Sequence, residues 1–407
     1  MQTPRAPERF IGAALNMSYF IPFVNSKSDW LLAQELYSGA VVYRVTVRSN
    51  SIEDWAASAH SKLWVDTEVD ALHNWPKSGS DEFTSYFGNF PDARAIGSST
   101  FWSKPDRATV ARFVDAILGH VLVKAPSVAW LSIPQLPQCD GSERNKINRA
   151  LAEATRQWKS KSGYKGALVL PAIFTHQKQL NNKTERNRKV DLVASCCELS
   201  GADCLWVVDS SLHDQDGTGS FAKRFHGIVK LHEELNQRVS PFVTNLAGPY
   251  WALGLVLWAR GLIEFTTLGV GRGYQYYIPG DPLLTSSKVR VALPPLRRQA
   301  VWSSGLREWI EGTFEDIPKG DPAYSELSEV LSQFSLLKDK LRARRQVAKF
   351  YREWLRKFES IPAQGRMLAL YQDFSSAYVL GKALDDIPDS KVRSASKIAE
   401  QFMMTCL

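Results

Sequence analysis

Short apolar runs, separated by segments with helical spacing, constrain this chain more than any other feature of its sequence. The clearest run, Cys204–Asp209, has five apolar residues and a terminal carboxylate, and it leads into the polar stretch Ser210–Gly217. A continuous apolar run that ends abruptly in polar residues predicts a strand buried on both faces. Eight such strands are expected, within Ala13–Phe23, Ala40–Val47, Lys62–Asp70, Val128–Gln135, Gly166–Phe174, Cys204–Asp209, Pro241–Asn245 and Ile263–Leu268.

Helix-like segments lie between these runs, and strands that alternate with helices predict a parallel sheet covered by helices. Eight strands within residues 10–280 match the roughly 250 residues of a (β/α)8 TIM barrel, and an open α/β sheet is the alternative. Residues 73–107 are rich in aromatic residues, Gly, Pro and Ser, and are expected to form an insertion with little regular structure. The helices are expected at Asp29–Tyr37, Ile52–Ala59, Arg107–Val123, Asn145–Lys159, Arg188–Leu199, Phe221–Asn236 and Tyr250–Ala259.

The C-terminal region, residues 281–407, is expected to be a mainly helical, basic extension of the barrel. Helices are predicted within Leu306–Phe314, Tyr324–Glu359 and Gly365–Cys406. The stretch Lys338–Glu359 has nine basic and three acidic residues, which predicts a helix with one basic face. Its buried stripe would consist of Leu341, Val347, Phe350, Trp354, Leu355 and Phe358.

Composition narrows the class of protein. A hydrophobic content of 44% suffices for a large core, and a net charge of +8 favours anionic partners. The five cysteines form no CxxC pair, so they are interpreted as reduced thiols. The N-terminus lacks the apolar core of a signal peptide, and no apolar run reaches the roughly 18 residues of a spanning helix. We therefore expect a cytoplasmic protein with no membrane partner.

The barrel prediction places catalytic groups at the carboxyl ends of the strands. Strand three brings Asp66 and Glu68 there and could also bring Asp70, while strand six brings Asp209. Carboxylates pressed together raise one another's pKa, so Asp66 and Asp209 are the candidate acid/base or nucleophile pair. His176, after strand five, could assist them as a general base or as a hydrogen-bond donor to the substrate. The alternative is that these acids cap strands or helices, and that Asp70 is an ordinary turn residue.

Other rim residues suggest contacts to the ligand. Arg44 or Arg48 could reach the rim from strand two, and His213 could join the acids. No compact His pair supports a metal site, so none is predicted, and the sequence identifies no cofactor. Backbone N–H groups after strands seven and eight could hold phosphate, unless their glycines serve only tight turns. The candidate phosphate-binding residues are Asn245, Gly248, Gly269, Gly271, Arg272 and Gly273.

Two basic segments predict binding of nucleic acid or a nucleotide, although charged segments are often only solvated surface. The aromatic residues of the insertion, Trp75, Tyr86, Phe87, Phe90, Phe101 and Trp102, could stack on bases, or some could belong to the core. The C-terminal helices could also bind protein partners. The candidate nucleic-acid-binding cations are Lys178, Lys183, Arg186 and Arg188 after strand five, and Arg344, Arg345, Arg352 and Arg356 in the basic helix.

The stretch Leu63–Glu68, on an early strand of a basic barrel and followed by aromatic residues, resembles the tRNA-guanine transglycosylases and the related 7-deazaguanine DNA-modifying barrels. The resemblance implies base exchange through aspartates, with Asp66 and Asp209 as the corresponding residues. The family's Asp-Ser-Gly-Gly pattern and its Cys/His zinc set have no counterpart in this sequence.

The expected function is that of a transferase or hydrolase acting on a glycosidic or phosphoester bond of a nucleotide or nucleic acid. One alternative is a non-catalytic subunit that binds nucleic acid or assembles a larger complex. A third is a barrel enzyme that acts on a small phosphorylated molecule.

Overall fold

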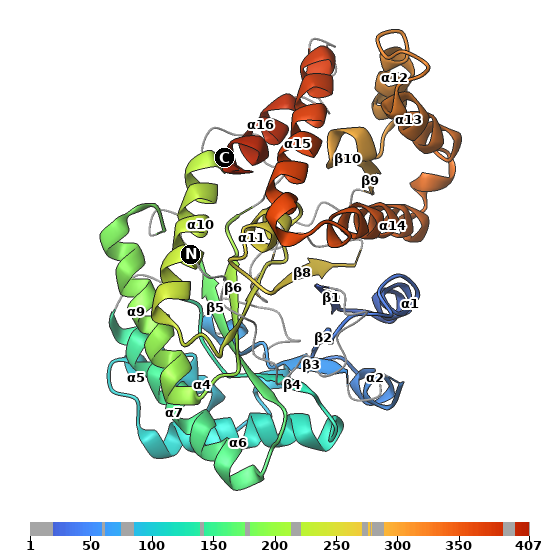
Figure 1. Cartoon of the computed structure of the whole chain (residues 1–407). Coiled ribbons are helices and arrows are strands. Elements are labelled where there is room, and N and C mark those ends of the chain that lie inside the picture. Colours follow the sequence, from blue (N-terminus) through green and yellow to red (C-terminus); the bar gives the residue numbers. More distant parts are fainter. Residues whose placement is uncertain are drawn as a thin grey trace.

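A closed barrel of parallel strands, in the order β1 to β8, lies at the centre of the computed structural model (Figure 1). The structure describes residues 19–58, 62–74, 85–138, 142–175, 180–212, 221–270, 276, 278, 289–385 and 395–406. The TIM-barrel prediction is therefore confirmed, and the open sheet is excluded. The strands are β1 (Phe20–Val24), β2 (Tyr43–Thr46), β3 (Leu63–Asp66), β4 (Trp130–Ser132), β5 (Ala167–Phe174), β6 (Cys204–Asp209), β7 (Thr244–Ala247) and β8 (Phe265–Gly269).

Side chains alternate between the barrel interior and the surrounding helices, as the period of a strand requires. On β6, for example, Trp206 and Val208 pack inside the barrel, whereas Leu205 and Val207 pack in the larger core beneath the helices. The interior is filled with large side chains, so it is a packed core. It includes Ile21, Phe23, Val42, Trp64, Trp130, Val169, Ile173, Trp206, Val208 and Leu246.

Helices surround the barrel (Figure 1). Their ends follow local sequence signals: Asp106 accepts a hydrogen bond from the Thr109 N–H at 2.8 Å, and Gly201 ends its helix in the left-handed conformation at φ 63°. They are α1 (Lys27–Leu36), α2 (Ile52–Ser58), α6 (Arg107–Lys124), α7 (Ser142–Ser162), α9 (Lys183–Ser200), α10 (Phe221–Arg238) and α11 (Leu253–Ala259).

Three sequence expectations within the barrel need correction. Strand seven was expected at Pro241–Asn245, but residues 241–243 form a turn and β7 begins at Thr244, where its N–H donates to the Asp203 carbonyl. The insertion after β3 is also more regular than expected. It contains the short helices α4 (Ala93–Ile96) and α5 (Ser99–Trp102). The predicted strand Lys62–Asp70 ends at Asp66, and Val69 and Asp70 belong to the 3₁₀ helix η3 (Val69–Asn74).

The C-terminal region is mainly helical, as expected, but it also contains an antiparallel strand pair, β9 (Arg290–Leu293) and β10 (Arg298–Val301). The predicted helical segment Tyr324–Glu359 contains two α-helices with a 3₁₀ helix between them, and Asp339 caps the second α-helix. The remaining elements are η4 (Pro294–Leu296), α12 (Ser304–Thr313), α13 (Pro322–Ser332), η5 (Leu336–Lys338), α14 (Lys340–Glu359), α15 (Ala363–Asp385) and α16 (Ala395–Cys406).

This region contributes to two hydrophobic cores. The strand pair, α12 and α13 form a core of their own, whereas α14 to α16 pack into the core that surrounds the barrel. The α14 stripe is buried at Val347, Trp354, Leu355 and Phe358, but Leu341 is exposed. None of the described helices combines the length and the apolar character needed to cross a membrane.

Candidate active site

Asp66, the last residue of β3, points into the barrel because it has the same orientation as Trp64 two residues earlier. Its carboxylate forms an ion pair with Arg44 of β2, and both side chains are almost fully buried. The Arg44 guanidinium lies over the ring of Phe23, with its Cζ atom 3.9 Å from the ring centroid, and 5.1 Å from that of Trp206. The barrel thus holds this cation between an acid and aromatic faces, an arrangement that stabilises a desolvated guanidinium.

Glu68 lies just beyond the end of β3, at φ 51°, in a region of backbone conformation that few non-glycine residues adopt. Its Oε2 atom accepts hydrogen bonds from Thr46 Oγ1 and from Arg48 Nε, each at 2.6 Å. The Glu68 N–H donates to Asp66 Oδ1 at 3.2 Å, which ties the two acids to one turn. The local backbone therefore places Glu68 beside Asp66 at the mouth of the barrel.

Asp70 follows in η3 and is buried, with 3% of its surface exposed. Tyr276, from the segment after β8, donates a hydrogen bond to Asp70 Oδ2 at 2.8 Å. Burial raises the pKa of Asp70 well above its usual range, and the negative charges of Asp66 and Glu68 act in the same direction. The Tyr276 hydrogen bond and the Arg44 charge oppose this rise in pKa.

These three acids, Asp66, Glu68 and Asp70, form what we call the acid cluster. Asp66 and Glu68 are paired with arginines, whereas burial and the neighbouring charges favour the neutral form of Asp70. When the surroundings of neighbouring carboxyl groups push their pKa values apart, one group can act as a proton donor and another as a base or charge stabiliser. The geometry of the cluster is therefore compatible with acid/base chemistry at the carboxyl end of the barrel.

Asp209 lies at the carboxyl end of β6 but on the other face of its strand. Val208 points into the barrel, so the alternation turns Asp209 toward the helices, and the residue that pairs with it on β5, Phe174, also packs beneath the helices. Asp209 Oδ1 accepts hydrogen bonds from the Ser211 N–H and hydroxyl, at 2.9 and 2.5 Å. Burial raises the pKa of Asp209, against the Ser211 hydrogen bonds and the charge of Arg224. The structure therefore groups Asp66 with Glu68 and Asp70, and it places Asp209 in a separate polar environment.

Several predicted site residues lie outside the described residues. These are His176, Lys178, Gly271, Arg272 and Gly273, and also His213. Gly269 is described, and it is buried at the end of β8, where it pairs with Phe23.

The two remaining phosphate candidates have structural partners. Asn245 pairs with Leu205 near the start of β6, and its amide donates to Asn236 Oδ1 at 2.7 Å, so it lies toward the amino end of the barrel. Gly248 accepts a hydrogen bond from Trp206 Nε1 at 2.7 Å. At φ +102°, a Cβ atom on Gly248 would be 2.8 Å from the Thr267 carbonyl oxygen, which explains the need for glycine.

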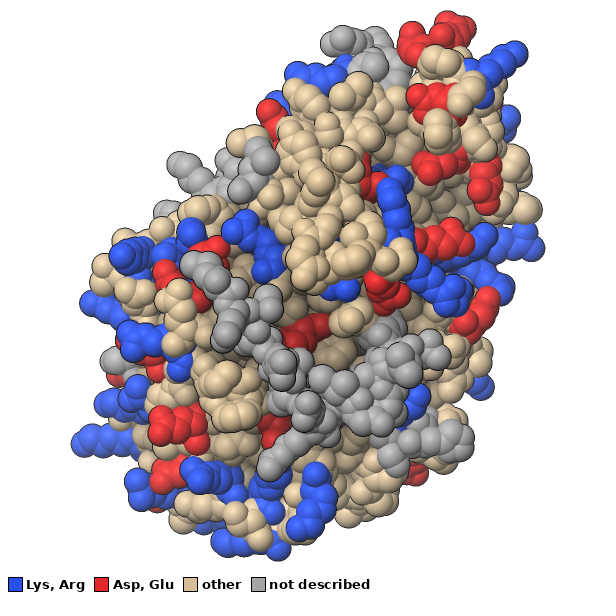
Figure 2. Space-filling view, in the orientation of Figure 1, with Lys and Arg blue, Asp and Glu red and all other residues tan. Residues whose placement is uncertain are grey.

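The predicted nucleic-acid-binding cations divide into paired and exposed groups. Arg186 forms a two-pronged ion pair with Glu234 at 2.7 and 2.9 Å, and Arg344 is paired with Asp29 of α1. Arg188 and Arg345 are exposed, but they pair with Glu185 and Glu35. Lys183 and Arg356 are exposed, and Arg352 is half-buried. Figure 2 shows Lys and Arg side chains interspersed with Asp and Glu over the visible face.

The aromatic residues of the insertion contribute mainly to the core. Phe87 and Trp102 are buried, and Tyr86, Phe90 and Phe101 are partly buried against the same core. Trp75 lies outside the described residues. Phe87 and Trp102 are therefore not accessible for stacking on bases.

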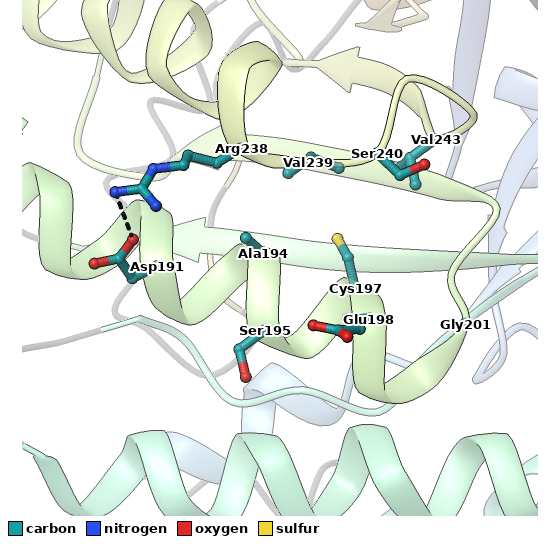
Figure 3. A pocket seen from close by; sticks show the side chains of 10 residues that line it. All are labelled: Asp191, Ala194, Ser195, Cys197, Glu198, Gly201, Arg238, Val239, Ser240 and Val243. Carbon is teal, nitrogen blue, oxygen red and sulfur yellow. Dashed lines mark ion pairs between the residues drawn. The ribbon is translucent and has the colours of Figure 1, made fainter.

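An open groove of about 670 Å³ lies between α9 and α10 (Figure 3). An ion pair between Asp191 and Arg238 spans one end of it, and Cys197 lines its floor. The groove is formed by the C-terminal end of α9 and by the segment that precedes β7, so it lies at the amino end of the barrel, away from the acid cluster. Because catalytic groups of this fold lie at the carboxyl end, we place the candidate active site at the acid cluster.

Tyr276 was not among the residues predicted from the sequence. It lies 206 positions from Asp70 along the chain, and no local pattern links the two residues. Among the described residues, no group of His, Cys, Asp and Glu side chains has an arrangement that could hold a metal ion.

Comparison of the chain with protein-family models and with curated proteins found no match to either. The resemblance to the transglycosylases therefore depends on the end of strand three and on the barrel fold alone.

Proposed function

We propose that this barrel is a hydrolase or transferase that cleaves a glycosidic or phosphoester bond in a nucleotide or nucleic acid. Asp70 would donate a proton to the leaving group, and Glu68 or Asp66 would act as base or stabilise positive charge. The observation that carries the proposal is the burial of three carboxyl groups together, one of them favouring the neutral form, at the carboxyl end of a TIM barrel.

The anionic class of substrate is supported by charge. The chain carries a net charge of +8, and Lys183 lies exposed in the first turn of α9, a helix whose N-terminus follows the carboxyl end of β5. Arg344 donates to the carbonyl of Val270, directly after β8, so the start of α14 also lies near this rim. Cations near the rim would draw a polyanion toward the acid cluster.

The test is a product screen of the full-length protein against nucleosides, nucleotides and single- and double-stranded oligonucleotides, analysed by mass spectrometry. A free base among the products would identify glycosidic cleavage, and a nucleoside or shortened strand would identify phosphoester cleavage. Asp70→Asn should lower product formation by about 10²–10⁴-fold. The control, Glu308→Gln, replaces an exposed acid on α12 and should leave product formation unchanged. Equal product formation by wild type and Asp70→Asn would refute the proposal.

A second candidate is a non-catalytic assembly subunit, and the surface of α15 favours it. Leu368 and Val379 are 62% and 65% exposed, and Figure 2 shows a broad uncharged area over this helix. Exposed apolar surface often marks a protein interface. In this case Leu368→Glu with Val379→Glu would abolish biological function, whereas Asp70→Asn would leave it intact.

A further inference from the structure

The phenol of Tyr276 is held rigidly at the mouth of the barrel. Its ring stands edge-on to Trp206, with centroids 5.2 Å apart and planes at 88°, and only 6% of the residue is exposed. On another side, the Arg44 guanidinium lies 5.6 Å from the centroid of the ring. These contacts fix the position of the phenol oxygen, which lies 2.8 Å from Asp70 Oδ2 and donates a hydrogen bond to it.

We propose that Tyr276 is a positioning residue for Asp70: its hydrogen bond fixes which carboxyl oxygen carries the proton, and it stabilises the carboxylate after that proton has left. The inference rests on the proposed function, since it assumes that Asp70 is the proton donor. Because Tyr276 donates to Oδ2, that oxygen acts as an acceptor, and the transferable proton of Asp70 resides on Oδ1.

The proton balance follows from this arrangement. Asp70 Oδ1 gives its proton to the leaving-group atom as the bond between that atom and the substrate breaks, and the electron pair of that bond stays on the leaving group. In hydrolysis, the oxygen of the attacking water forms the new bond to the substrate, and its proton passes to the base, Glu68 or Asp66, from which a proton returns to Asp70. In transfer, the hydroxyl of the acceptor takes the place of the water. Tyr276 keeps its own proton throughout and contributes a stronger, charge-assisted hydrogen bond while Asp70 is ionised.

The charges around Asp70 explain why such a partner is needed. Asp66 and Glu68, from its own strand-end segment, disfavour the carboxylate, whereas Arg44 from β2 and Tyr276 from the segment after β8 favour it. Without Tyr276, the pKa of Asp70 would rise further, and Asp70 would give up its proton less readily.

The experiment is an infrared pH titration of the full-length protein without substrate. The carbonyl band of protonated Asp70 is identified as the band that Asp70→Asn removes. In Tyr276→Phe we expect its midpoint to rise by about one pH unit, equivalent to about 1.4 kcal/mol. The control is Tyr324→Phe, a half-buried tyrosine of α13 whose ring packs on Phe314, and it should leave the midpoint unchanged.

A second titration tests the same hydrogen bond without the Tyr276→Phe substitution. Replacing the tyrosines biosynthetically with fluorotyrosine, whose phenol is a stronger donor, should lower the Asp70 midpoint in the otherwise wild-type chain. An unchanged midpoint in both Tyr276→Phe and the fluorotyrosine protein would overturn the inference. So would the lack of any band that Asp70→Asn removes.

The two proposals fail in different ways. If Asp70→Asn strongly lowers product formation but the Asp70 midpoint is the same with and without the Tyr276 hydroxyl, the positioning role is wrong and the proposed function stands. If Asp70→Asn leaves product formation intact, the proposed function is wrong whatever the titration gives.

Discussion

Replacing Arg44 with methionine should destabilise the protein strongly, because it would leave the buried carboxylate of Asp66 without its cation. The two side chains are 2% and 3% exposed, so water cannot replace the lost partner. Removing one member of a buried ion pair typically costs about 3–5 kcal/mol. Since the Glu68 N–H still donates to Asp66 Oδ1 at 3.2 Å, we expect the lower half of that range. Methionine retains much of the aliphatic stem, which limits loss of packing against Phe23 and Trp206.

Thermal unfolding followed by circular dichroism measures this effect. With an unfolding entropy of about 2.1 cal/mol/K per residue, a loss of about 3–4 kcal/mol lowers the Tm of a 407-residue chain by about 4–5 °C. The matched control is Arg307→Met, which removes an exposed arginine paired with Glu311 one turn away, and it should cost less than about 0.5 kcal/mol. A Tm for Arg44→Met equal to that of the control would refute the view that the ion pair is buried and unsolvated.

Three further predictions concern the helices around the barrel. Asp373 is buried against Arg297 and Lys357, which hold its pKa below its usual range despite burial. The stability that this pairing contributes is present above the unfolded-state pKa of about 3.9, and it is lost as the pH falls through the lower folded-state pKa. Asp373→Asn should therefore remove this loss of stability in acid from the pH profile of unfolding. Gly254→Ala should destabilise the protein by about 1–3 kcal/mol, because its Cβ would lie 2.0 Å from Thr266 Oγ1, whereas Gly312→Ala has open space and should be neutral or stabilising in denaturant titrations. Charge reversal of Arg352 and Arg356 together should weaken salt-sensitive binding to single-stranded DNA without lowering the Tm, and unchanged binding would remove α14 from any nucleic-acid interface.

The barrel could be predicted from the sequence because buried parallel strands leave a strong signal. Runs such as Cys204–Asp209 and Ala167–Phe174 are apolar on both faces, and their number and spacing match a closed barrel. Strand seven was predicted to begin too early because residues 241–243 form a turn although Pro241, Phe242 and Val243 are apolar. Local composition does not distinguish an apolar turn from the start of a strand.

The same property explains why the candidate site was predicted only in part. A strand that is apolar on both faces gives no indication of which face lies inside the barrel, so Asp66 and Asp209 looked equivalent. The structure turns Asp66 toward Arg44 and Asp209 toward Ser211. From the sequence, Asp70 could be an acid at the strand end or an ordinary turn residue, because its partner Tyr276 lies 206 positions away along the chain and is brought close only by the fold.

The most direct test of the central claim, that Asp70 is a neutral acid at the active site, is the kcat/KM of Asp70→Asn toward the best substrate of the product screen. Asparagine is neutral and has nearly the same shape as a protonated aspartate, so the Tm should stay close to that of the wild type. We predict that kcat/KM falls by about 10²–10⁴-fold, the usual contribution of a general acid. An Asp70→Asn protein that folds normally and turns over substrate at the wild-type rate would contradict the assignment of the acid cluster as the active site.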